Sequence, residues 1–314
     1  MGASHFNPDE LAAQALAGGG PRGDGIRETM HEQYRHFFAQ LPYLFIGAID
    51  SAGWPVASLL WGQPGFVQSP DPVTLHIAAL PDSSDPAAQA LQPGREIGLL
   101  GLDLSTRRRI RANGRIVDRD AGGIRVAIAQ SFGNCPQYIQ LRTIAASQLG
   151  SIRAAASPAL SFHRLDDAAR AAIAATDTFF VASRSRARDG ASYGADISHR
   201  GGRPGFVGID DDRGGSNVLT IPDFRGNRYF NTLGNLIADP RASLLVVDFE
   251  TGDLLQLQGV AEVDWNAAAA QRFPGAERLW RFHVARGWRR KAALPMRWSF
   301  LEYSPATAQT GTWL

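Results

Sequence analysis

An internal duplication constrains the fold of this chain more than any other sequence feature. The segment Pro64–Val67 (PGFV) recurs 140 residues later as Pro204–Val207. The segment Leu99–Asp103 (LLGLD) matches Leu244–Asp248 (LLVVD) at a spacing of 145 residues. These matches keep one order, with a drift of only about five residues, as copies of one unit do. The sequence therefore predicts two copies of one unit, each of roughly 130 residues, within the 314-residue chain.

Each copy is predicted to be mainly β, because short apolar runs alternate with turn residues. In the first copy we expect a helix, five strands and a short helix before the fourth strand: helix 28–40, strands 44–49, 56–61, 73–78, 97–102 and 109–117, with the short helix opening at Asp85-Pro86. The second copy repeats the plan, beginning with a helix over 166–175 and a strand over 179–183. This pattern favours two tandem, mainly antiparallel β-barrels with short helices.

The remaining segments set the predicted domain boundaries. Residues 1–25 end in a Gly-rich stretch and are predicted to be a flexible arm with a short helix over 9–17. Residues 26–150 are assigned to the first barrel, and the part over 123–149 is predicted to be a mostly helical extension. An Ala- and Ser-rich linker over 151–165 leads to the second barrel, residues 166–314.

Composition excludes several classes of protein. A single cysteine excludes a disulfide framework and any Cys-only zinc or iron–sulfur site. Lys291 is the only lysine, which excludes the Gly-Lys pair of a P-loop. No apolar run reaches the ~18 residues of a membrane helix, and the polar first residues do not resemble a signal peptide. We therefore expect a cytoplasmic protein without a membrane partner.

The two copies differ most where a ligand site is expected. The second strand reads VASLL over 56–60 in the first copy and DISHR over 196–200 in the second. After the third strand, the first copy has PDSS over 81–84, whereas the second has RGNRYFNT over 225–232. Arginines at a helix N-terminus suit a phosphate, because guanidinium groups and unpaired backbone N–H groups point the same way. The alternative reading is a capped helix with a solvated arginine pair.

At these residues the chain resembles the pyridoxamine 5′-phosphate oxidase-like, FMN-binding split-barrel family. The resemblance lies mostly within residues 170–265. The segment 218–249 runs from a strand through a polar turn, a basic segment and a helix to Asp239-Pro240-Arg241 and an apolar strand. The segment 194–207 resembles the family's flavin-facing strand, and the first copy resembles a degenerate half of the family's usual dimer. The fold implied is two tandem split β-barrels in one chain.

The resemblance implies one FMN, held mainly by the second half. The implied cofactor-binding residues are Ser198, His199, Arg200, Asp223, Arg225, Asn227, Arg228, Asn231 and Thr232. Arg200 and Arg228 would neutralise the phosphate, and Asn227, Asn231 and Thr232 would complete its hydrogen bonds. The flavin ring or ribityl chain would contact Ser198, His199 and Asp223. No residue stands out as a general acid or base.

The implied function is that of an FMN-dependent oxidoreductase with a small-molecule substrate or a redox partner. The family's C-terminal pair of arginines around a proline is not evident, so oxidation of vitamin B6 is not expected. The alternative is a non-catalytic flavin- or haem-binding protein. A homodimer remains open. The arginine runs at 107–111 and 286–291 are interpreted as solvated or interface charge, so a nucleic-acid partner is not expected.

Three other motifs carry little weight. The GxGxxG match at 18–23 does not follow a strand, and the GxSxG match at 190–194 precedes a strand instead of a helix. The residues His31–His36 have one position too many for HExxH, so no metal site is expected. Cys135 is interpreted either as a buried small hydrophobic residue or as a pocket-lining or redox residue.

Overall fold

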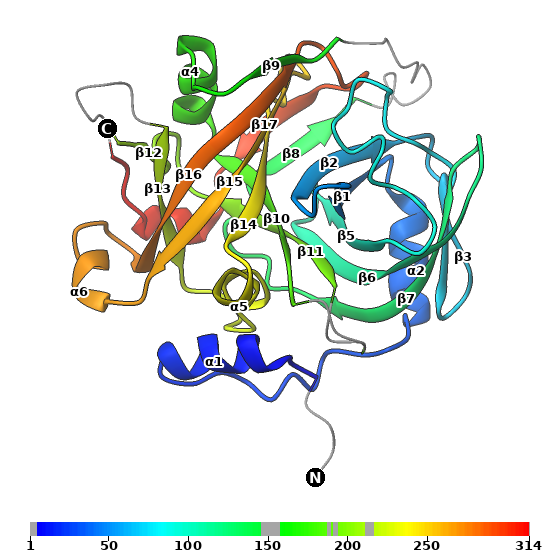
Figure 1. The fold of residues 1–314 in the computed structure, drawn as a ribbon, viewed down its shortest axis with the longest axis horizontal. Coiled ribbons are helices and arrows are strands. Elements are labelled where there is room, and N and C mark those ends of the chain that lie inside the picture. Colours follow the sequence, from blue (N-terminus) through cyan, green and yellow to red (C-terminus); the bar gives the residue numbers. More distant parts are fainter. Residues whose placement is uncertain (1–4, 146–157, 187–189, 191–193, 211–216, 314) are drawn as a thin grey trace.

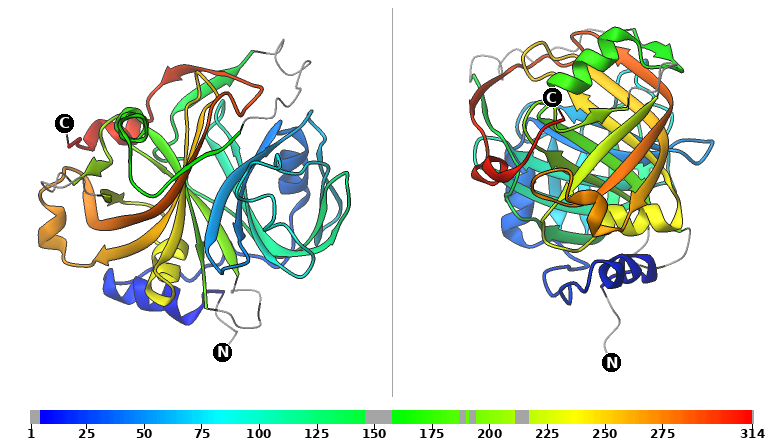
Figure 2. Two further views of the ribbon diagram at one scale, coloured as in Figure 1. Left: turned by 45° about the horizontal axis from the view of Figure 1, so that its top comes forward. Right: turned by 90° about the vertical axis from the view of Figure 1, so that its left-hand side faces the viewer.

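Antiparallel strands dominate the computed structural model, which describes residues 5–145, 158–186, 190, 194–210 and 217–313. The strands form two large sheets, and each curves around its own core (Figure 1). The two halves lie side by side, with the N-terminal segment running along one edge of both (Figure 2).

The two sheets have the same strand order. The first sheet contains β1 (Tyr43–Ile49), β2 (Pro55–Trp61), β3 (Val67–Asp71), β4 (Thr74–Ile77), β5 (Glu96–Asp103), β6 (Arg108–Arg119) and β7 (Ile124–Gly133), in the order β2-β1-β5-β6-β7-β4-β3. The second contains β10 (Thr178–Arg184), β11 (Ala195–Gly201), β12 (Gly208–Ile209), β13 (Val218–Phe224), β14 (Arg241–Val247), β15 (Leu254–Asp264) and β16 (Ala276–Arg290), in the order β11-β10-β14-β15-β16-β13-β12. Each strand of one sheet has a counterpart at the same place in the other, which confirms the duplication and the mainly β fold. The short β9 (Leu160–Phe162) pairs with β16.

A repeated glycine shows why the copies bend alike. The register between β6 and β7 shifts at Gly114, and that between β15 and β16 shifts at Gly259. A Cβ on Gly114 would overlap the carbonyl of Ala127, and one on Gly259 would overlap the carbonyl of His283. Only glycine lets the facing backbone come this close, so each copy needs it at the same bulge.

The helices agree with the prediction at most positions. Besides α1, described below, they are α2 (Glu32–Gln40), α4 (Asp167–Ala175), α5 (Asn231–Ala238), the short α6 (Ala267–Ala270) and the 3-10 helix η1 (Pro305–Gln309). The short helix predicted from Asp85 is wrong, because residues 86–90 form turns and 91–92 have no regular structure. Pro86 and Pro93 bound a segment that is too short to continue as a helix without strong packing.

The helical extension predicted over 123–149 is also wrong. Its described part forms β7 and β8 (Leu141–Ile144), and β8 pairs with β17 (Trp298–Glu302). In β7 the buried Ile124, Val126 and Ile128 alternate with more exposed neighbours. This two-residue period is that of a strand with one buried face, and it outweighs the helix-forming alanines between them.

A third apolar core joins the two halves. The rings of Phe45 from β1 and Phe180 from β10 are stacked with their centroids 3.6 Å apart, and both side chains are fully buried. Ala57, Ile197 and Leu245 belong to the same core. Each half therefore buries an apolar sheet face against the other.

The N-terminal segment is packed where a flexible arm was expected. Helix α1 (Pro8–Leu16) matches the short helix predicted over 9–17 and lies against α5 (Figure 1). Phe6 is buried, and its ring meets that of Tyr229 edge-on at 5.2 Å. In the described parts of the chain, none of the helices has both the length and the apolar character that crossing a membrane requires.

Candidate functional site: an arginine-lined cavity at the start of α5

A small cavity lies where β11, β13 and α5 of the second half meet β6 of the first half. Its volume is about 60 Å³. The lining residues are Arg111, Ser198, Arg200, Asp223, Phe224, Gly226, Asn227, Arg228, Phe230, Asn231, Thr232, Glu277 and Arg278. Seven of the nine residues predicted to bind the cofactor are among them, so the structure brings most of the predicted set together. Their role as ligands stays a prediction.

Strand β11 presents two of these residues on one face. Successive side chains of a strand point to opposite faces, so Ser198 and Arg200 share a side. The hydroxyl groups of Ser198 and Thr232 share a hydrogen bond of 2.7 Å, which ties β11 to the first turn of α5. The guanidinium of Arg200 lies 3.7 Å from the carboxylate of Asp223 on β13.

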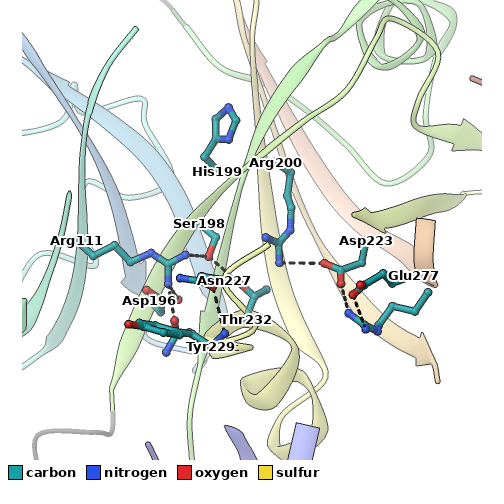
Figure 3. A network of polar contacts seen from close by, with 12 residues as sticks. Arg111, Asp196, Ser198, His199, Arg200, Asp223, Asn227, Tyr229, Thr232 and Glu277 are labelled. Atoms are coloured by element: carbon teal, nitrogen blue, oxygen red, sulfur yellow. Dashed lines mark hydrogen bonds and ion pairs between the residues drawn. The ribbon is translucent and has the colours of Figure 1, made fainter. Parts of the chain in front are cut away.

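Arg111 reaches this site from the first half of the chain (Figure 3). Its Nη1 donates to Asp196 at 2.8 Å and to the side-chain oxygen of Asn231 at 3.2 Å. Its Nη2 donates to the hydroxyl of Ser198. Sequence reasoning missed Arg111, although an arginine between Ile110 and Ala112 in a buried strand is a signal that it has a specific partner.

The backbone that leads into α5 is strained. Arg228 and Phe230 both have a φ of 58°, in the left-handed region that non-glycine residues rarely adopt. Phe230 is the N-cap of α5 and makes no side-chain cap hydrogen bond. Strain of this kind persists only where the surrounding structure holds it in place, and it often accompanies a binding site. The first turn of α5 thus points toward the cavity without the usual Ser, Thr or Asp cap.

Positive charge in and beside the cavity is incompletely matched by the protein. The buried Nε atoms of Arg111, Arg200 and Arg228 have no hydrogen-bond partner among the described residues. Burial lowers the pKa of Arg200, and burial together with the Arg111 charge lowers that of the nearby Arg109 to about 9. Both shifts mean that these guanidinium groups are crowded in a poorly solvated place. A small anion with several acceptor oxygens would relieve both problems.

The other end of the cavity is acidic. Asp223 accepts a hydrogen bond from Arg278, which also lies 3.1 Å from Glu277. The Arg278 guanidinium stacks over the ring of Phe230 at 4.8 Å. Arg111 pairs with Asp196, and Arg200 pairs with Asp223, so Arg228 is the cavity arginine without an ion pair in the described contacts. An anion would therefore sit near the start of α5.

Two predicted residues lie elsewhere. Arg225 is exposed and does not line the cavity. His199 points to the opposite face of β11, away from Ser198 and Arg200 (Figure 3). Asn227 does line the cavity, although it is exposed, and its side chain accepts the backbone N–H of Tyr229 at 3.1 Å.

The environment of His199 fixes its protonation state. Arg109 Nη1 lies 3.2 Å from its Nδ1, and a guanidinium can only donate. Nδ1 is therefore an acceptor, so the neutral ring carries its hydrogen on Nε2. Burial, then the charge of Arg109, lowers the pKa of His199 well below its ordinary value. Nε2 is buried without a partner among the described residues.

Cys135 lies in a loop beside the site. It is half-buried, and its sulfur accepts the backbone N–H of Gln137 at 3.4 Å. Tyr138 of the same loop has a φ of 63° and stacks on the cavity residue Phe224 with the ring centroids 5.2 Å apart. These contacts support neither reading of Cys135 over the other.

Comparison with known proteins adds three reference points. No family model and no curated protein matches the chain. An FAD-binding protein from Mesorhizobium loti is 15% identical, covers 42% of this chain and 97% of its own, and gives a TM-score of 0.28. HutZ, the haem storage protein from Vibrio cholerae, is 14% identical over 41% of this chain and 95% of its own, with a TM-score of 0.28.

A third solved structure comes from Clostridium acetobutylicum. It is related to general stress protein 26 of the pyridoxinephosphate oxidase family, is 13% identical, covers 43% of this chain and 92% of its own, and gives a TM-score of 0.28. The solved structures similar to this chain thus include pyridoxamine 5′-phosphate oxidase-type proteins. Each matches less than half of the chain.

Proposed function

We propose that this chain is an FMN-binding flavoprotein with oxidoreductase activity, and that it binds the FMN phosphate at the start of α5. The observation that carries the proposal is the convergence of Arg111, Arg200 and Arg228, each with an unpartnered Nε, on a cavity of about 60 Å³. That volume suits a phosphate group and not a whole nucleotide. The family resemblance of the segment 218–249 supports FMN as its bearer.

The chain's own residues would bind and orient the cofactor. Arg200 and Arg228 offer charge-assisted donors, Ser198 and Thr232 offer hydroxyl groups, and the first turn of α5 offers backbone N–H groups. When bound, FMN supplies hydride or electron transfer through its ring, so the protein need not supply a general acid or base. The missing C-terminal arginine pair argues for a substrate other than vitamin B6.

The alternative is a non-catalytic flavin- or haem-binding protein. One residue tests its haem-binding form. A haem-ligating histidine presents an unprotonated nitrogen to the metal and donates its other N–H to a carboxylate or carbonyl. His199 has the reverse arrangement, because its Nδ1 faces the donor Arg109 and its Nε2 carries the hydrogen. His199 is therefore not arranged as a haem ligand.

The visible spectrum of the purified protein tests the cofactor, and mass identification of the released molecule tests its identity. We expect a yellow protein with about one FMN per chain, since only the second copy has the basic segment 225–232 before its helix. A stoichiometry near two, or FAD or haem in place of FMN, would contradict the proposal. Steady-state oxidation of NAD(P)H with an added acceptor then separates an oxidoreductase from a non-catalytic binder.

A further inference from the structure

Helix α1 brings a buried glutamate to the edge of the cavity. Glu10 is only 5% exposed, although it lies on a nine-residue surface helix. Its Oε1 accepts the side-chain amide of Asn231 at 2.5 Å, and its Oε2 accepts the backbone N–H of Asn7 at 2.8 Å. Both carboxyl oxygens therefore accept a hydrogen bond, one from the N-cap residue of α1 and one from the first residue of α5.

Asn231 connects Glu10 to Arg111. Its Nδ2 donates to Glu10, and its Oδ1 accepts from Nη1 of Arg111 at 3.2 Å. An asparagine amide can bind in two orientations that exchange oxygen and nitrogen. The acceptor oxygen of Glu10 selects the orientation in which the Asn231 oxygen faces the guanidinium. Without that acceptor, the NH₂ group of Asn231 could face Arg111, donor against donor.

Helix α1 packs closely enough against α5 for Glu10 to control the orientation of the Asn231 amide. A Cβ on Gly234 of α5 would overlap the backbone of Glu10, so glycine is what lets the two helices touch here. Arg228 donates to the carbonyl of Ala17 just beyond α1. The ring contact between Phe6 and Tyr229 lies at the other end of the helix. The two ends of helix α1 are thus both attached to the loop that leads into α5.

We propose that Glu10 is a positioning residue of the anion site. It orients Asn231, which holds Arg111 against Ser198, so α1 acts on the phosphate site through Asn231 without lining the cavity. This inference rests on the proposed function, because it takes the cavity at the start of α5 to be where phosphate binds.

Glu10 should also make the affinity for the anion depend on pH. The charged groups that face it are Asp196 from β11 and Arg111 from β6, while Asp9 of its own turn pairs with Arg186 at 3.4 Å. Arg228, from the loop before α5, contacts the end of α1. Burial, opposed by the hydrogen bonds from Asn231 and Asn7, raises the pKa of Glu10 from 4.5 to about 7. Burial therefore eases the protonation of Glu10, whereas the ionised carboxylate accepts both hydrogen bonds but brings negative charge toward the anion and so weakens its binding.

The test measures dissociation constants of the full-length protein for inorganic phosphate and for FMN by calorimetry, from about pH 5.5 to about pH 8.5. Because the ligands titrate too, affinities are compared as ratios between wild type and variants at each pH. Glu10→Gln keeps an acceptor oxygen for Asn231, loses the hydrogen bond from the Asn7 N–H because its NH₂ group only donates, and cannot ionise. We expect it to bind like wild type below pH 7 and progressively more tightly than wild type above it. Glu10→Ala should bind both ligands about 5- to 10-fold more weakly at low pH, the effect of one lost hydrogen bond.

Two further variants separate positioning from a loss of structure. Asp9→Asn removes one charge from the same helical turn without touching Asn231, so its ratio to wild type should stay constant with pH. Gly234→Ala leaves Glu10 in the chain but displaces α1, and it should weaken phosphate binding as Glu10→Ala does. This variant also covers the case in which Glu10→Ala fails to fold.

The outcomes distinguish the two proposals. If wild type binds neither phosphate nor FMN, the proposed function is wrong. If wild type binds both, unchanged phosphate binding in Glu10→Ala or in Gly234→Ala overturns the positioning role of Glu10 and leaves the FMN proposal standing. A ratio of Glu10→Gln to wild type that does not change through pH 7 overturns the pH dependence of that role.

Discussion

The two halves of the chain use one fold to build two different interfaces. In one, the edge strand β11 meets β6, and Arg111 contacts Ser198 beside the cavity. In the equivalent place of the other, the edge strand β2 meets β15, with Ser58 in the position of Ser198 and Gln256 in that of Arg111. The surroundings of these matched pairs are very different.

The second interface pairs a buried arginine with a buried carboxylate. Ser58 donates to Asp85 at 2.5 Å, and Gln256 donates to the same carboxylate at 3.1 Å. Arg290 forms an ion pair with Asp85, and both side chains are only 1% exposed. At the first interface, the polar strand Ser198–Arg200 replaces Ser58–Leu60, and the Nε atoms of Arg111, Arg200 and Arg228 have no partner among the described residues, whereas at the second only that of Arg290 lacks one. The comparison teaches that one buried arginine with its own carboxylate stabilises a fold, whereas a cluster of arginines that outnumbers its carboxylates marks a place for an anion.

The largest expected effect comes from breaking the closed interface. Arg290→Ala leaves the Asp85 carboxylate buried without its cation, which should lower the free energy of unfolding by about 3–5 kcal/mol. Urea denaturation followed by fluorescence measures this. Bound FMN per chain should not change in the fraction that folds. A loss below about 1 kcal/mol would show that the pair is not the buried contact described here.

The shared core between the halves should be almost as sensitive. Phe180→Ala removes the ring stacked on Phe45 and should cost about 3–5 kcal/mol, because a large buried side chain is replaced by a cavity. The two halves should still unfold in one transition, since each loses part of the same core. Two separate transitions in the wild-type protein would contradict this view. So would a fragment of residues 165–314 that is monomeric and binds FMN as tightly as the whole chain.

The open interface should respond in ligand binding more than in stability. Arg228→Ala should weaken FMN binding by about 10- to 100-fold, the loss of a charge-assisted hydrogen bond of roughly 1.5–3 kcal/mol. Riboflavin lacks the phosphate, so its affinity should change little. The matched control is Ser84→Ala in the first half, which should alter neither affinity. Equal weakening of FMN and riboflavin would move Arg228 away from the phosphate.

The smallest effect compares the equivalent helices α2 and α4. Asp166 caps α4 by accepting the backbone N–H of Ala169 at 2.8 Å, whereas His31 at the start of α2 makes no side-chain cap bond. Asp166→Ala should therefore cost about 1 kcal/mol, and His31→Asp should gain about 0.5 kcal/mol. Thermal unfolding detects both changes. Equal effects at the two positions would mean that capping does not distinguish these helices.

Local patterns in the sequence were enough for the strands and the duplication. Strands β1, β2, β5 and β6 lie within one to two residues of their predicted bounds at most ends. The segment 123–149 failed because alanines and a broken period hid the alternation of Ile124, Val126 and Ile128. The two-residue strand β12 and the edge strand β3 were not predicted, since neither has a continuous apolar run to reveal it.

The residues of the candidate site also divide into those that the sequence could reveal and those that it could not. Ser198, Arg200, Arg228 and Thr232 could be named because they lie in two short polar segments that the first copy lacks. Arg111 and Glu10 could not, because each reaches the site from more than 80 residues away along the chain. Glu10 lies in the segment expected to be flexible, and nothing in a polar first turn shows that one of its carboxylates is buried.

The sequence by itself determined that the chain folds as two similar β units and that only the second has a basic loop before a helix. Apolar periodicity and repeated glycines fix these features locally, since each acts through neighbours in the same strand or turn. The tertiary structure alone decided which arginines are left without a protein acceptor. That outcome depends on how β6 and α1 pack against β11 and α5. Charge pairing across such contacts is set by three-dimensional distance and burial, which no local pattern encodes.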